Sequence, residues 1–193
     1  MLILGFFFLL HPGEYAYTDN ADASPFRLCG KHLIVMNRRL NPLTCSDTDL
    51  QDTNFVGLHF TTQKNGVRGE IVGLGRSGHP VLCPVHAMIT HVTHLRLYHA
   101  IPTTPIYATY THRGWTNIST STLTQHLHIA LSAIQYEVGI TPADISVRSL
   151  RASGAMALLC AEVDTDKSGS LADGKAMRCF ATCTFRPSQL WLP

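Results

Sequence analysis

The chain has 193 residues, of which 45% are hydrophobic and only 15% are charged. That length suits one domain with a sizeable core and is too short for two full enzyme domains, and the composition excludes disorder over the whole chain. Fifteen Lys and Arg against thirteen Asp and Glu give a net charge of +2, so a nucleic-acid partner would need a local basic surface, helped by some of the eleven His. The chain has no run of about 18 apolar residues, which argues against a transmembrane helix.

The apolar run at residues 1–10 predicts a buried helix that stops near Pro12. This run, followed by the small-x-small sequence at residues 21–23, also resembles a signal peptide, but a basic n-region is missing and His11 follows at once. We therefore expect a core helix. The six Cys are irregularly spaced, which favours cytosolic or nuclear thiols over a disulfide framework.

Short strands are predicted in the next part of the chain. Residues 33–36 form a β-like run, and residues 55–62 alternate well enough for a strand. The Asn65-Gly66 pair is a strong hairpin signal, and residues 69–74 are expected to return as the partner strand.

Helices are predicted in the second half. Residues 83–98 are expected to be helical, and residues 100–117 form a connection rich in Pro, Thr and Tyr. Ser119 or Ser121 caps a helix that runs to about Val138, where Gly139 ends it. Residues 141–144 open the next helix, which runs to about Val163. The expected fold class is α+β and mainly α-helical, with one small antiparallel sheet.

The most informative segment covers residues 145–162, ISVRSLRASGAMALLCAE. Arg148 and Arg151 are three residues apart, so they share one helix face, and the small residues at 152–157 allow close packing. Two Arg at the start of such a helix suit a phosphate contact, because guanidinium groups and helix N-termini both favour anions. A pair of solvated surface arginines explains this spacing equally well.

Three motifs in this chain together carry a resemblance to a known family. Residues 148–159, RSLRASGAMALL, resemble the R-box of the tyrosine recombinases (phage-integrase family), in the form found in eukaryotic mobile elements. Residues 6–15, FFFLLHPGEY, resemble the helix end that carries the family's first catalytic Arg. Residues 60–70, FTTQKNGVRGE, place Lys64 at a β-turn, where the family keeps its catalytic Lys. The order and rough spacing match over residues 1–167.

The resemblance implies DNA strand cleavage and rejoining. In the family a Tyr attacks the scissile phosphate and forms a 3′-phosphotyrosyl bond, two Arg clamp the phosphate oxygens, and a Lys protonates the leaving 5′-oxygen. Neither a metal nor another cofactor is implied. Residues 1–167 then form a partial tyrosine-recombinase catalytic domain, without the DNA-clamping domain of a whole recombinase. Residues 168–193 form an aberrant tail that we expect to be poorly ordered.

This chain departs from the family pattern in ways that predict an inactive protein. Arg151 matches the second Arg, Lys64 the Lys, and Glu14 the acidic residue, whereas His11 replaces the first Arg and Arg148 stands at the His position. A neutral His cannot make the bidentate contacts of an Arg.

The nucleophilic Tyr is also missing. Tyr107, Tyr110 and Tyr136 all precede the R-box, so none occupies the nucleophile's place. We therefore expect a DNA-binding remnant of a mobile-element integrase, a pseudoenzyme that contacts DNA through Lys64, Arg148 and Arg151. DNA is the expected partner, with self-association on DNA left open, and neither a membrane nor a small-molecule substrate is expected. The expected location is nuclear in a eukaryote and otherwise cytoplasmic, with secretion disfavoured.

Alternative motifs point to other functions but fit them poorly. Residues 164–175 resemble an EF-hand loop, but Lys175 stands where a bidentate Glu is required. With the signal-like N-terminus, this loop leaves a small secreted or calcium-binding protein as the alternative function. The spacing of one Cys and three His also fits no standard zinc module, so no metal site is expected; these residues are Cys83, His86, His91 and His94. Trp115 lies beside a basic residue and is expected to be packed.

The tail after Lys167 can be explained by a shifted reading frame. If one A precedes the Ser168 codon, allowed codons for the tail regroup to encode IRLLGRWKSDEMLRYLHVQAFP. That string holds the missing Gly-Arg-Trp and a Tyr-Leu-His at the place of the family's nucleophile. The hypothesis is that a one-base deletion, or a gene-model error, lies at the junction of Lys167 and Ser168.

Overall fold

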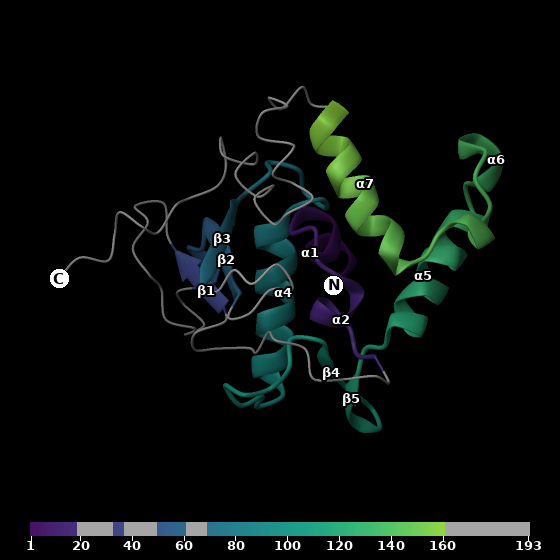
Figure 1. The fold of residues 1–193 in the computed structure, drawn as a ribbon. Coiled ribbons are helices and arrows are strands. Elements are labelled where there is room, and N and C mark those ends of the chain that lie inside the picture. Colours follow the sequence, from purple (N-terminus) through teal and green to yellow (C-terminus); the bar gives the residue numbers. More distant parts are fainter. Residues whose placement is uncertain (19–32, 37–49, 61–68, 161–193) are drawn as a thin grey trace.

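The computed structural model describes residues 1–18, 33–36, 50–60 and 69–160. Within these ranges the fold is mixed α+β, with helices packed beside a three-stranded sheet (Figure 1). The elements are α1 (Leu2–Phe7), α2 (Pro12–Tyr15), β1 (Leu33–Met36), β2 (Phe55–Phe60), β3 (Glu70–Gly75), α4 (Pro84–Leu97), β4 (Ala108–Thr111), β5 (Gly114–Asn117), α5 (Thr120–Ser132), α6 (Gln135–Val138), a 3₁₀ turn (Pro142–Asp144) and α7 (Val147–Cys160).

The three-stranded sheet has the order β1-β2-β3, and both pairs of strands are antiparallel. β2 is central, and its alternate residues Val56, Leu58 and Phe60 are buried. The strand predicted at residues 33–36 is confirmed, and those predicted at 55–62 and 69–74 are strands over 55–60 and 70–75, with residues 61–62 outside the described part of the chain. The predicted Asn65-Gly66 turn, and Lys64 beside it, lie outside the described residues.

α4 packs on this sheet and supplies much of the core. Its buried face is formed by Val85, Met88, Val92 and Leu95, whose spacing of three and four residues keeps them on one side of the helix. α1 joins the same core through Leu4 and Phe8. The expected N-terminal core helix is confirmed, and within the described residues no helix is long and apolar enough to cross a bilayer.

The helix boundaries follow the capping residues. Cys83 is the N-cap of α4, and its Sγ accepts a hydrogen bond from the backbone N–H of His86. Of the two Ser considered as caps for α5, Ser119 takes this role and accepts from the N–H of Thr122 at 3.1 Å. Gly139 ends α6 in the left-handed conformation, with a φ of 68°.

Residues 100–117 differ from the prediction, because they contain a hairpin. β4 and β5 pair antiparallel, so the described residues hold two small sheets where one was expected. The turn places Gly114 at a φ of +96°, a value that a side chain rarely tolerates. His94 of α4 contacts β4, and His91 of α4 contacts Ile106 just before it, so sequence pattern alone did not reveal this hairpin.

The helices that follow also differ from the prediction. The helix expected to reach Val138 is interrupted after Ser132, and α6 resumes at Gln135. The helix expected to open at residues 141–144 is a separate 3₁₀ turn, closed by Thr141 donating to the Asp144 carboxylate. Ile145 then adopts an extended conformation, and the helix proper begins at Val147.

Candidate functional site

His11 and Arg151 meet where α1 and α7 pack together, which we call the α1–α7 junction. A guanidinium nitrogen of Arg151 contacts Nε2 of His11, although 140 residues separate the two. These residues stand at the positions of the first and second Arg in the predicted site. His11 is exposed and Arg151 is half-buried, so the pair lies at the surface of the junction.

The end of α1 determines where His11 lies. Leu10 N–H donates to the carbonyl of Gly5 at 3.1 Å, a bond typical of a Schellman helix end. This end requires a left-handed residue, and Leu9 supplies it with a φ of 51°, at a cost of about 1–2 kcal/mol for a residue with a side chain. The chain then turns sharply, and His11 begins α2 in an extended conformation.

The small residues of α7 bring Arg151 to the same point. A methyl group built on Gly154 would lie 2.4 Å from the carbonyl oxygen of Phe6 and 2.6 Å from Cδ2 of Leu9. The absence of a side chain at Gly154 therefore lets α7 approach the backbone of α1. Arg151 precedes Gly154 by one turn of the same helix, so this close approach carries Arg151 toward His11.

Two residues of α2 hold the junction together. The Glu14 carboxylate accepts a hydrogen bond from the backbone N–H of His11 at 2.6 Å. The Tyr15 ring packs on Gly5, and its hydroxyl donates to the carbonyl of Val147 at the start of α7, at 3.1 Å. α2 therefore links the end of α1 to the beginning of α7.

The structure does not place every predicted site residue beside this pair. Arg148 is exposed in the first turn of α7, where Ser146 caps its backbone N–H at 3.3 Å. Lys64 belongs to the segment between β2 and β3, which lies outside the described residues. The predicted tail at 168–193 and the EF-hand-like loop at 164–175 also lie outside them.

The one Tyr that packs within the junction is unsuited to attack a phosphate. Burial raises the pKa of Tyr15 to about 12, and its hydroxyl already donates to Val147. Its side chain is fully buried, so a DNA phosphate would not reach it. Tyr15 therefore has a structural role.

The histidines of α4 also have structural roles. His91 contacts the carbonyl of Ile106 through Nε2, and burial lowers the pKa of His91 to about 4, which keeps its ring neutral. His94 Nε2 lies 3.1 Å from Oγ1 of Thr109 and accepts from the N–H of Tyr110 at 3.3 Å. His91 holds the segment that precedes β4 and His94 holds β4 itself against α4. Among the described residues no group of three or more His, Cys, Asp or Glu could hold a metal ion.

Sequence reasoning missed one surface feature. Trp115 was expected to be packed, but it is 45% exposed and lies beside Tyr110 across the β4–β5 hairpin. The alternation of residues 109–111 and the Arg113-Gly114 turn could have indicated the hairpin. Neither would have shown that the aromatic rings face solvent.

The α1–α7 junction has the chemistry of an anion site. A guanidinium has several N–H donors in one plane, which match the oxygens of a phosphate. Arg151 supplies a planar guanidinium at this point, and His11 supplies one imidazole nitrogen where a second Arg would supply several N–H donors. The pair is suited to binding a phosphate and poorly suited to stabilising a more highly charged transition state.

Comparisons of the chain with protein-family models, with curated proteins and with solved structures found no match.

Proposed function

We propose that this protein binds duplex DNA at the α1–α7 junction and is a catalytically inactive remnant of a tyrosine recombinase. One observation carries the proposal. The resemblance assigns His11 and Arg151 to the two phosphate-clamping positions of that family, and these residues are in contact although 140 residues separate them. If the resemblance were accidental, there would be no reason to expect a contact between these two residues in particular.

The expected inactivity follows from two replacements. With His11 in place of an Arg, the clamp loses a bidentate donor, and the loss of one such donor typically lowers a catalytic rate by about 10²–10³. Residues 137–193 contain no Tyr, so we propose that this part of the chain does not supply the nucleophile of the covalent step. DNA binding requires neither the nucleophilic Tyr nor both Arg of the clamp, so we propose that this protein still binds DNA.

The reading-frame hypothesis gives this loss a genetic cause. Sequencing the gene and its transcript across the codons of Lys167 and Ser168 tests the hypothesis. A restored frame that encodes Gly-Arg-Trp and a downstream Tyr supports it, and a frame that encodes neither contradicts it. The proposed DNA binding does not depend on this result.

Fluorescence anisotropy with a labelled duplex at low salt tests the proposed function. The wild-type protein is compared with Arg151→Ala, and with Arg76→Gln as a matched control that removes one positive charge from an exposed residue after β3. We expect binding by the wild type, clearly weaker binding by Arg151→Ala, and near wild-type binding by the control. Equal losses in both variants, or no binding at low salt, would contradict the proposal.

A further inference from the structure

Three aromatic side chains form a continuous exposed group, which we call the aromatic platform: Tyr98, Tyr110 and Trp115. Tyr98 stacks on Tyr110 with ring centroids 4.4 Å apart and an interplanar angle of 15°. Tyr110 meets Trp115 edge to face at 5.4 Å. The three are 37%, 37% and 45% exposed, so large aromatic surfaces remain in contact with water.

The aromatic platform is held by neighbouring groups. Tyr98 caps the end of α4, and the His94 ring packs against it at 5.1 Å while its Nε2 accepts from the N–H of Tyr110. Tyr110 and Trp115 are directly opposite each other in the hairpin register. The hairpin turn is closed by Thr111, whose hydroxyl donates to the carbonyl of Gly114. The rings are therefore positioned before any ligand arrives.

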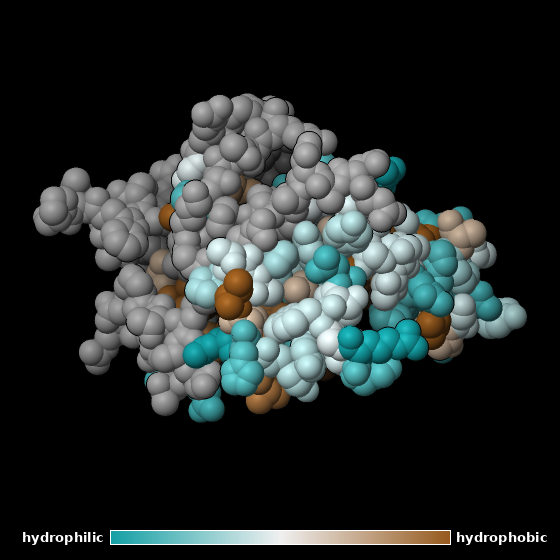
Figure 2. All heavy atoms as spheres, turned by 90° about the horizontal axis from the view of Figure 1, so that it is seen from below, coloured by the Kyte–Doolittle hydropathy of each residue, from teal (hydrophilic) through white to brown (hydrophobic). Residues whose placement is uncertain are grey.

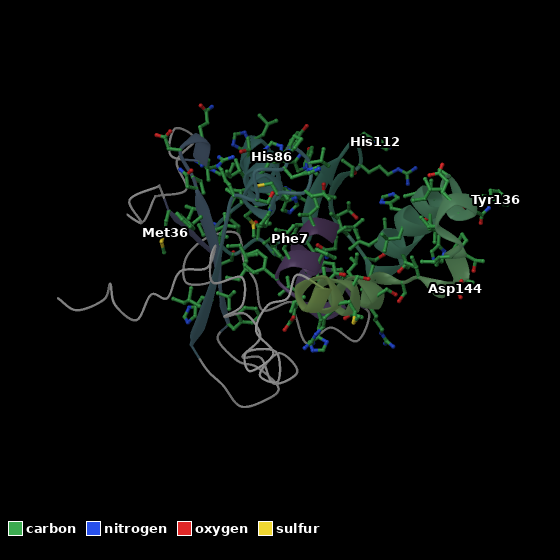
Figure 3. The ribbon with its side chains drawn as sticks, turned by 90° about the horizontal axis from the view of Figure 1, so that it is seen from above. Phe7, Met36, His86, His112, Tyr136 and Asp144 are labelled. Carbon is green, nitrogen blue, oxygen red and sulfur yellow. The ribbon has the colours of Figure 1, made fainter. Side chains whose placement is uncertain are left out.

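The ionisable side chains in the part of the chain that carries the platform include basic groups but no carboxylates. Residues 71–136, which include α4, β4, β5 and α5, contain three Arg and eight His but no Asp or Glu. Arg113 and His112 are exposed at the hairpin turn, which lies at the periphery of the molecule (Figure 3). The end of the molecule that carries the hairpin shows mostly residues of intermediate hydropathy with hydrophilic ones among them (Figure 2). Such a surface suits a ligand with flat rings and negative charge.

We propose that the aromatic platform binds single-stranded DNA, with unpaired bases stacked on Tyr110 and Trp115 and with phosphates beside Arg113. Exposed aromatic rings next to basic groups bind unpaired strands in this way, because every base has a flat face that can stack. In a duplex those faces are covered by neighbouring bases, so the platform would select the unpaired strand. The inference goes beyond the proposed duplex binding, because it uses none of the residues at the α1–α7 junction.

Trp115 provides a direct readout of such binding. The chain has two Trp, so the variant Trp191→Phe leaves Trp115 as the one Trp fluorophore. Titration of this variant with a short thymidine oligonucleotide is expected to quench its fluorescence and to saturate. The same strand annealed to its complement is expected to quench it clearly less. Equal quenching by the duplex, or no quenching by the single strand, would overturn the proposal.

Substitutions in the same background test whether stacking is responsible. Tyr110→Leu keeps an apolar side chain but loses the flat ring, and is expected to weaken binding about tenfold, whereas Tyr110→Phe is expected to bind like its parent. Tyr136→Leu is the matched control, because Tyr136 is 95% exposed on α6 and outside the platform. Unchanged binding by Tyr110→Leu, with circular dichroism showing that it is folded, would contradict stacking.

Two further titrations separate this inference from other accounts. An acidic peptide, polyglutamate, is expected not to compete with the oligonucleotide, and effective competition would show that charge alone is recognised. Arg151→Ala is expected to leave quenching by the single strand unchanged. If Arg151→Ala abolishes that quenching, the platform is not a separate site. If duplex binding fails while quenching persists, the proposed function fails and this inference stands.

Discussion

The side chains of His11 and Arg151 are in contact because Gly154 lets α7 touch the end of α1, a few residues before His11. The junction depends on packing that can be altered without changing either residue. Measurements of stability therefore test the packing of the α1–α7 junction. Measurements with DNA test the proposed binding there.

Replacing Gly154 by Ala is expected to destabilise the protein. Helix propensity alone would give a gain of about 1 kcal/mol for this change. The added methyl would overlap the carbonyl of Phe6, which is backbone and cannot rotate away, so overpacking of about 1–3 kcal/mol should reverse the sign. Urea denaturation measures the difference, with Ser153→Ala on the exposed face as the control. A more stable Gly154→Ala protein would show that α1 and α7 are not in such close contact.

Replacing Tyr15 by Phe is expected to cost about 1 kcal/mol of unfolding free energy. The change removes the buried hydrogen bond to the carbonyl of Val147 and keeps the ring that packs on Gly5. Tyr136→Phe is the matched control, because that ring is exposed on α6 and should have no measurable effect. Equal stability of the two variants in thermal or urea denaturation would argue against the link between α2 and α7.

Acid is expected to destabilise the protein partly through His91. Burial lowers the pKa of His91 from 6.5 to about 4, so the unfolded chain binds a proton in this window that the folded chain does not. The contribution of His91 is complete above pH 6.5 and is lost as the pH falls toward 4, by up to about 1.4 kcal/mol per pH unit.

The variant His91→Gln keeps a donor for Ile106 but does not titrate. It is expected to flatten the pH dependence of unfolding free energy between pH 6.5 and 4, whereas His126→Gln on the exposed face of α5 should leave that dependence unchanged. An unaltered slope in His91→Gln would mean that the imidazole is not buried in its neutral form.

If the proposed function is right, an Arg in place of His11 is not expected to give covalent chemistry. Suicide substrates that trap phosphotyrosyl intermediates should yield no adduct with the wild type or with His11→Arg, because residues 137–193 contain no Tyr. Denaturing electrophoresis with labelled DNA gives the readout. A phosphotyrosyl adduct mapped by mass spectrometry to any Tyr of this chain would refute the inactive assignment.

The sequence predicted the elements that depend on local signals. β1 occupies residues 33–36 as expected, since this short apolar run fits a strand. Cys83 and Gly139 mark helix ends at their predicted places. The start of α7 was wrong, because the residues at 141–144 carry an ordinary helix-start pattern, whereas the carbonyl of Ile145 is held by His128 from α5 at 2.7 Å. That contact joins residues 17 apart and leaves no local signal.

Two of the predicted site residues, His11 and Arg151, are in contact, and their role in binding stays a prediction. The order of the motifs named His11 and Arg151, yet their contact depends on Gly154 meeting the backbone of α1. The aromatic platform was not predicted, because β4 and the residue Ile106 before it are held by His94 and His91, which the sequence presents as an unassigned His-rich helix. Long-range contacts of this kind produce no periodic pattern of apolar residues from which they could be predicted.

The salt dependence of duplex binding tests the central claim most directly. Each phosphate contact releases counterions, so the logarithm of the affinity falls linearly with the logarithm of the salt concentration. If Arg151 contacts a phosphate, Arg151→Ala should reduce the steepness of that line by about 1, and Arg76→Gln, at an exposed residue outside both proposed sites, should leave it unchanged. A slope for Arg151→Ala equal to that of the wild type would contradict phosphate binding at the α1–α7 junction.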